Sequence, residues 1–151
     1  MKLNTWECGV TAGLIATAAI IIISYPLAVF NVITLCDTEY AARFLMSIEN
    51  QPMTPIHWLV GLLTNFSLGA LFGMATTYFY QIFGFDSKLL KIIGIGIALW
   101  FFHLVIVPFL DPTVAKYSTP SVAISFFINY IIWSIIASLF IYKYLRRTGT
   151  T

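Results

Sequence analysis

The sequence predicts an all-α polytopic membrane protein, in which a single transmembrane domain of residues 1–151 forms a four-helix bundle. Hydrophobic residues make up 60% of the chain and charged residues only 9%, whereas a soluble surface needs roughly 25–35% charged residues. The charges also leave four long stretches empty. Because a charge at the bilayer centre costs ~2.5–3.5 kcal/mol, such stretches mark membrane spans. A soluble monomer, a disordered chain and, at a net charge of +2, a nucleic-acid binder are excluded.

The first expected span covers residues 8–35. Its apolar run is much longer than the ~7–15 residues of a signal-peptide core, and no small-residue cleavage site follows it, which argues against a cleaved signal. Small residues dominate its first half, where Gly9 and Gly13 form a GxxxG pair. Pro26 removes one backbone donor, so we expect a kink there.

A short interfacial helix is expected after the first span, over about residues 37–50. Apolar side chains recur there at helical spacing, with charged residues on the other faces, as in helices that lie along a membrane surface. A helical extension of the first span into solvent explains the same pattern equally well.

The other three spans are expected at residues 55–83, 89–110 and 120–145. Thr54-Pro55 and Thr119-Pro120 each place an N-cap residue before a proline at the first helical position. The short loop before Thr119 favours antiparallel contact between the third and fourth spans. Pro108 is expected to kink the third span near its end.

The positions of the basic residues predict the orientation, because cytoplasmic loops carry the excess of Lys and Arg. Arg43 and Lys116 lie on one side of the four spans. The other side carries Lys2, Lys88, Lys91, Lys143, Arg146 and Arg147, a ratio of six to two. We therefore expect a multi-pass protein of the cell inner (plasma) membrane with both termini in the cytoplasm.

Close helix packing is indicated in the second span as well as the first, since Gly69 and Gly73 repeat the GxxxG spacing. Small residues four apart let helix backbones approach closely, which drives helix association in lipid. Packing inside one bundle explains such pairs, and so does self-association or contact with another membrane protein.

Motifs for catalysis and metal binding are missing from the sequence. It contains no H-E-x-x-H cluster, no catalytic Ser/His/Asp set and no phosphate-binding loop, so we expect neither an enzyme nor a metal site. Cys8 and Cys36 lie at opposite ends of the first span, too far apart for a disulfide. The spans also lack Asp, Glu, Lys and Arg, which argues against ion-driven transport.

Neutral polar residues are therefore the candidates for a functional pocket. Helix depth places several of them in the outer half of the bundle, beneath the loop that carries Asp111. Because unpaired polar groups in hydrocarbon are costly, we expect them to face inward and bond one another or water. The candidates are His103, His57, Asn31, Asn65, Asn129 and Asp111.

Two histidines in a four-helix bundle also raise the hypothesis of bis-histidine haem ligation. The expected depths of His57 and His103 differ by roughly 7 Å, which is awkward for one iron. The alternative makes His103 a buried hydrogen-bond partner, with Asp111 within its reach, and His57 an interfacial residue. No cofactor is expected under this alternative.

Residues 55–147 resemble the YagU/YqhR-like family of small conserved bacterial inner-membrane proteins. The resemblance rests on the aromatic-rich segment that ends in His103 and is followed by Pro108, together with a glycine-rich second span, Asp111-Pro112, Trp133 in the last span and a basic end at Arg146-Arg147. It implies a four-helix inner-membrane protein without established catalytic residues, and it raises the importance of His103 and Pro108.

Three functions remain open on the sequence. The favoured one is a non-enzymatic accessory or oligomer-forming subunit that acts through helix–helix contacts, supported by the GxxxG pairs and the short loops. A second is a small channel or carrier for a neutral solute, lined by the polar residues. A third is a haem- or quinone-binding membrane subunit.

Overall fold

The computed structural model describes residues 4–30, 32–33, 35–46, 48, 51–116 and 119–148. Within these residues the fold is all-α, as predicted, and the elements follow one another as α1 (Thr5–Val29), α2 (Asp37–Met46), α3 (Pro55–Phe83), α4 (Lys88–Phe101), η1 (Phe102–Ile106), α5 (Val107–Leu110), α6 (Pro112–Ala115) and α7 (Pro120–Thr148). Four helices are long and apolar enough to cross a membrane, namely Thr5–Val29, Pro55–Phe83, Lys88–Leu110 and Pro120–Leu145.

Local sequence signals explain where two of the long helices begin. Asn4 caps α1, since its side chain accepts from the Glu7 N–H at 2.9 Å while the Glu7 carboxylate accepts from the Asn4 N–H at 2.8 Å. This reciprocal pair satisfies two donors that a helix end otherwise leaves without partners. Thr54 caps α3 in the same way with His57.

The first span ends six residues earlier than expected, at Val29 instead of residue 35. Pro26 lies inside the last turn of α1 and has no N–H to donate, which weakens the helix there. The Phe30 N–H still bonds the Pro26 carbonyl at 2.9 Å, after which the Val32 N–H reaches back to the Leu27 carbonyl at 2.8 Å. The chain thus leaves the helix soon after the proline.

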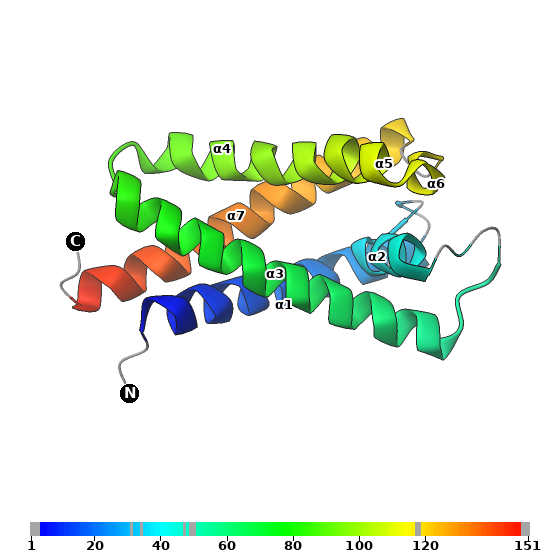
Figure 1. Ribbon diagram of the computed structural model, residues 1–151, viewed down its shortest axis with the longest axis horizontal. Helices are drawn as coiled ribbons and strands as arrows, with labels where there is room; N and C mark the ends of the chain where they lie inside the picture. The colour runs from blue at the N-terminus through cyan, green and yellow to red at the C-terminus, as the bar shows by residue number, and fades with distance from the viewer. Residues whose placement is uncertain are drawn as a thin grey trace.

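The long helices pack side by side in the order α3, α1, α7, α4, and neighbours in this order run antiparallel. α3 packs on α1, α1 on α7, and α7 on α4, and Figure 1 shows both chain ends and the α3–α4 turn at one end of the bundle. α3 and α4 are joined by a short turn yet scarcely touch each other. The bundle is therefore open between α3 and α4.

The contact between α1 and α3 is made by the two glycine pairs. A methyl group on Gly13 would overlap the Gly69 carbonyl, and one on Gly73 would come within 2.7 Å of the Gly13 Cα. A methyl group on Gly9 would come as close, 2.7 Å, to the Cα of Met74. The four glycines thus face one another inside the bundle, where the absence of side chains lets the two backbones approach closely.

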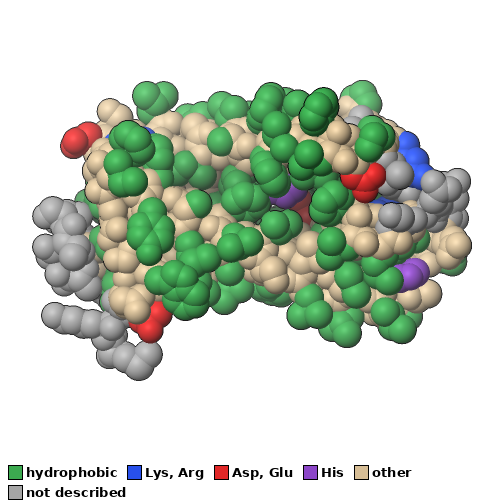
Figure 2. All heavy atoms as spheres, in the orientation of Figure 1, with side chains coloured by type: hydrophobic (Ala, Val, Ile, Leu, Met, Phe, Trp, Pro, Cys, Tyr) green, Lys and Arg blue, Asp and Glu red, His purple; other side chains and the backbone are tan. Residues whose placement is uncertain are grey.

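The outer surfaces of the helices are apolar. Ile22, Ile82 and Leu89 are each more than 70% exposed, and Figure 2 shows hydrophobic side chains spread over the length of the visible face. A soluble protein rarely exposes so much contiguous apolar surface. These helices are matched to a bilayer, and the structure supports a multi-pass membrane protein.

α2 is a separate helix and not an extension of α1. It packs against α3, where Gly61 meets the backbone of Thr38 so closely that a Cβ on the glycine would overlap the Thr38 carbonyl. Asp37, Thr38 and Tyr40 are buried, while Glu39 and Arg43 form an ion pair at 2.7 Å near the surface. The amphipathic pattern was thus interpreted correctly as a helix, but its first turn points into the bundle and not at the water.

Candidate functional site

Asp37, at the start of α2, is the most unusual residue of the structure. It is only 7% exposed, and its Oδ2 accepts a 2.7 Å hydrogen bond from the Asn129 amide of α7. Its other oxygen, Oδ1, is buried without a hydrogen-bond partner among the described residues. Asn129 is the tenth residue of α7, roughly 14 Å along that helix from its start. The carboxyl group therefore lies deep within the bundle.

The surroundings of Asp37 favour its neutral form. Burial raises the pKa of Asp37 to about 6, against the lowering effect of the hydrogen bond from Asn129 and of the nearby Ser24 hydroxyl. Burial dominates because removing a carboxylate from water costs more free energy than the hydrogen bonds of its polar neighbours restore. A proton on this group is thus exchanged close to neutral pH.

Two cavities adjoin the carboxyl group. The first, of about 40 Å³, lies between α1, α3, α4 and α7, and the second, of about 120 Å³, lies between α2, α3 and the end of the third span. Both have room for water molecules. Five residues line both cavities and so form the wall between them: Asp37, Asn65, Leu68, His103 and Tyr130.

His103 lies on η1 and is 8% exposed. Its Nδ1 is 2.9 Å from the Leu99 carbonyl, one turn earlier in the chain. Since a carbonyl only accepts, Nδ1 carries the hydrogen and Nε2 is an acceptor in the neutral ring. The imidazole stacks on Tyr130 with ring centroids 4.7 Å apart. This packing fixes the ring against the two cavities.

The π-helical turn Phe102–Ile106 lets the third span form a hydrogen bond with α2. In this turn the Val107 N–H bonds the Phe102 carbonyl, five residues earlier. The next donor in that register would come from residue 108, which is a proline and has no N–H. The His103 carbonyl is left free, and the Tyr40 hydroxyl donates to it at 2.8 Å. The effect of Pro108 is thus an open backbone acceptor, which α2 fills.

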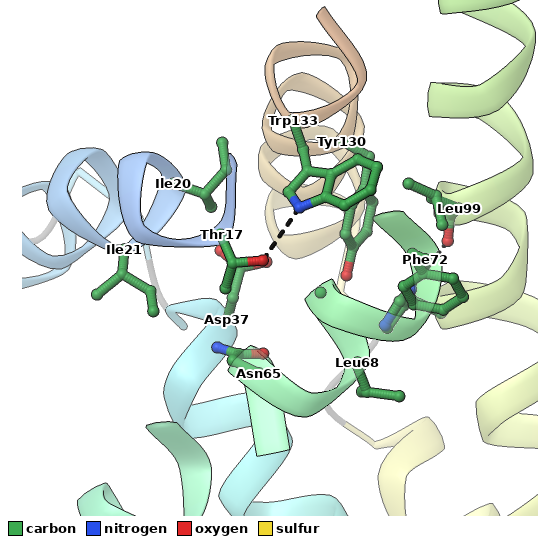
Figure 3. A pocket seen from close by; sticks show the side chains of 12 residues that line it. Thr17, Ile20, Ile21, Asp37, Asn65, Leu68, Phe72, Leu99, Tyr130 and Trp133 are labelled. Atoms are coloured by element: carbon green, nitrogen blue, oxygen red, sulfur yellow. Dashed lines mark hydrogen bonds between the residues drawn. The ribbon is translucent and has the colours of Figure 1, made fainter. Parts of the chain in front are cut away.

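The rest of the first cavity is lined by residues of α1, α3, α4 and α7 (Figure 3). Trp133 donates from its indole N–H to the Thr17 hydroxyl at 3.1 Å, which ties α7 to α1. Asn65 donates from its amide to the Thr38 hydroxyl at 3.3 Å, which ties α3 to α2. Phe72 completes the wall on the α3 side.

Three of the residues predicted for a pocket are brought together. His103 and Asn65 line both cavities, and Asn129 holds the carboxylate that separates them. His57 is used at the N-terminus of α3, where its Nδ1 accepts from the Thr54 N–H at 3.1 Å. Asp111 lies near Tyr40, where its charge adds to the effect of burial in raising the pKa of Tyr40 to about 12. Asn31 lies outside the described residues.

The sequence reasoning missed Asp37, since it lies outside all four charge-free stretches and was assigned to the membrane surface. One signal pointed to it: the helix that it begins carries an apolar face wide enough to be buried. Asp37 belongs to that face through its neighbours Tyr40 and Ala41, both buried in the structure.

Haem does not fit the two histidines. His57 lines neither of the two cavities at Asp37, whereas His103 lines both, so the fold does not face the two imidazoles toward one iron. Among the residues that the structure describes, no group of three or more His, Cys, Asp and Glu side chains could hold a metal ion.

A third, apolar cavity of about 440 Å³ occupies the open edge between α3 and α4. It shares Phe72 and Leu99 with the first cavity, so the two adjoin. In Figure 2 a hollow in the middle of the visible face shows a histidine and an acidic side chain at its base. The polar centre of the bundle can thus be approached from the side that faces lipid.

No known protein family, curated protein or solved structure matches this chain.

Proposed function

We propose that this membrane protein binds a small polar solute in the cavities at Asp37 and serves as a carrier or channel for it. Four apolar helices indicate a multi-pass membrane protein. The polar centre of the bundle supports the binding of a solute.

One observation carries the proposal: the buried carboxyl group of Asp37 has an oxygen without a partner and adjoins two cavities. Ionisable groups at membrane depth are costly, and where they occur they mark the paths and binding sites of solutes and ions. A purely structural polar group would have both oxygens satisfied, as nearly all buried polar groups have.

Flux through proteoliposomes tests the proposal. The purified protein is reconstituted, and the uptake of glycerol, urea and methylammonium is compared with that of protein-free vesicles. We expect at least one of these solutes to enter at least tenfold faster with the wild-type protein. Asp37→Asn and His103→Ala should reduce this rate to the background.

The matched control is Asp86→Asn, because Asp86 is exposed at the α3–α4 turn and lines none of the three cavities. This variant should retain the wild-type flux. Background rates for all three solutes with correctly folded wild-type protein would contradict the carrier function.

The helix-contact function predicted from the sequence is a second proposal, and one observation favours it. Gly94 on α4 lines the third cavity and has nothing within 4 Å of the position that a Cβ would occupy, so no described helix packs against this small residue. A second copy of the chain would contact α4 there. Crosslinking in native membranes tests this, and recovery of monomer alone would count against it.

A further inference from the structure

We propose that the solute bound at Asp37 is an organic cation, a primary ammonium on a short alkyl chain, which competes with a proton for the carboxyl group. This inference rests on the solute-binding function proposed above and specifies the charge and shape of the ligand.

Three side chains at the cavities offer acceptor atoms, beside the hydroxyl groups of Thr17 and Tyr130. Asp37 offers Oδ1, which lacks a partner, and His103 offers Nε2 in the neutral ring because Nδ1 bonds the Leu99 carbonyl. Asn65 uses its amide nitrogen on Thr38, which leaves its carbonyl oxygen on the cavity side (Figure 3). A ligand that satisfies these atoms must bring several donors, and an ammonium group has three.

The described residues that surround Asp37 include no Lys or Arg. The titratable groups that face it are Cys36 and Tyr40 from its own segment, His103 from η1 and Tyr130 from α7. Among the described residues, α1 and α3 contribute only neutral groups such as Ser24 and Asn65. No Lys or Arg lines the two cavities at this carboxyl group. A carboxylate buried in this way requires either a proton or a cation from outside.

Aromatic rings supply the remaining walls. Phe72, Tyr130 and Trp133 line the first cavity together with Asp37. The faces of such rings attract ammonium groups, and the attraction is strongest where water is excluded. A carboxylate with aromatic walls thus favours a cation over a neutral or an anionic solute.

The apolar groove between α3 and α4 fits the chain of such a ligand. It adjoins the first cavity at Phe72 and Leu99, and its lining is apolar apart from Thr76 and Lys91, whose ammonium group donates to the Phe83 and Gly84 carbonyls at the α3–α4 turn. Because the groove lies along the open edge of the bundle, an alkylammonium ion can enter from the bilayer with its head group directed at Asp37. We expect the alkyl chain to lie along Gly94 and Ala98 of α4.

Proton competition follows from the same carboxyl group. With a pKa of about 6, Asp37 is mostly ionised at pH 7.5 and mostly protonated at pH 5. The ammonium ion binds the ionised form, so each ion that binds to a protonated site releases one proton to the solution. The cation and the proton therefore exclude each other at the single negative charge of the Asp37 carboxylate.

Equilibrium binding of radiolabelled hexylammonium to the full chain in lipid nanodiscs tests the inference, with empty nanodiscs subtracted. Hexanol and hexanoate are the matched neutral and anionic probes of the same chain length. We expect hexylammonium to bind at least tenfold more tightly than either at pH 7.5. The affinity should fall about tenfold at pH 5, because hexylammonium itself stays charged there and only the site titrates.

Asp37→Asn should abolish the preference for hexylammonium and its pH dependence, whereas Asp86→Asn should keep both. The pH profile and the probe comparison on the wild-type protein decide the matter even where Asp37→Asn does not fold. Equal binding of hexanol and hexylammonium would overturn the inference and leave a neutral-solute carrier intact. No binding of hexylammonium above empty nanodiscs, or unchanged binding in folded Asp37→Asn, would overturn it as well.

Discussion

Asp37 shows how one side chain can set the chemistry of a small membrane protein. Its carboxyl group accepts a hydrogen bond from the Asn129 amide and has the Ser24 hydroxyl as a second polar neighbour, and no Lys or Arg among the described residues lines the two cavities beside it. The group therefore stays protonated to a higher pH than an exposed aspartate. Tyr40 and His103 fix the geometry around it through the hydroxyl-to-carbonyl bond.

The stability of the protein should depend on pH through Asp37. The pKa is about 6 in the folded state and 3.8 for an unperturbed aspartate, so the folded state holds the proton more tightly. The tighter proton binding of Asp37 adds about 3 kcal/mol to the free energy of unfolding. This contribution is complete below pH 3.8 and is lost as the pH rises to about 6.

Unfolding in detergent between pH 4 and pH 8 measures this dependence. Asp37→Asn should flatten the loss of stability between pH 4 and pH 6, because the asparagine keeps an acceptor for Asn129 and does not ionise. Asp86→Asn should behave as the wild type. Identical pH profiles for Asp37→Asn and the wild type would contradict the burial of an ionisable Asp37.

At the scale of elements, two backbone features position the site. The glycines of α1 and α3 bring Thr17 close to Gly69, so closely that a methyl group on Gly69 would overlap the Thr17 hydroxyl. The π-helical turn before Pro108 frees the His103 carbonyl for α2. The first feature depends on glycines, which have no side chain, and the second on Pro108, which has no backbone N–H. Both hold the cavity walls in place.

Gly13→Ala should destabilise the protein by about 1–3 kcal/mol, the usual cost of overpacking, because its methyl group would overlap the Gly69 carbonyl. Gly94→Ala is the matched control. Its methyl group meets nothing within 4 Å, and alanine favours a helix by up to about 1 kcal/mol over glycine. Unfolding in detergent measures both, and equal effects of the two substitutions would contradict the α1–α3 contact.

At the scale of the whole molecule, an even number of spans places both chain ends on one side. The structure agrees, because the termini and the α3–α4 turn lie at one end and α2 at the other (Figure 1). Which end faces the cytoplasm depends on the distribution of Lys and Arg, which predicts the end with the termini. The opening between α3 and α4 then faces the bilayer.

Cysteine labelling in intact cells tests this orientation. A membrane-impermeant maleimide should label Gln51→Cys in the α2–α3 loop from outside, and Asp86→Cys only after the cells are permeabilised, since both positions are exposed. The wild-type protein is the control. Cys8 and Cys36 are 0% and 2% exposed, and burial raises the pKa of Cys36 to about 11, so neither should react. The reverse labelling pattern would contradict cytoplasmic termini.

The number of spans, the N-cap at Thr54 and the helix after the first span could be predicted from the sequence, because each depends on local properties. A charge-free stretch of sufficient length spans a bilayer whatever its neighbours are, and Thr54-Pro55 begins a helix by its own hydrogen bonds and fixed φ angle. The inward positions of His103, Asn65 and Asn129 followed from the cost of polar groups in hydrocarbon.

Tertiary structure alone decided what these residues surround. Asp37 lies outside every apolar stretch, so only the packing of α2 against α3 shows that its carboxyl group is buried beside Asn129. The length of α1, the π-helical turn at His103 and the open α3–α4 edge depend likewise on contacts between distant segments. The burial and the pKa of Asp37 depend on its neighbours. Two of these, Ser24 and Asn129, lie far apart in the chain, and no periodic pattern in the sequence shows that they meet.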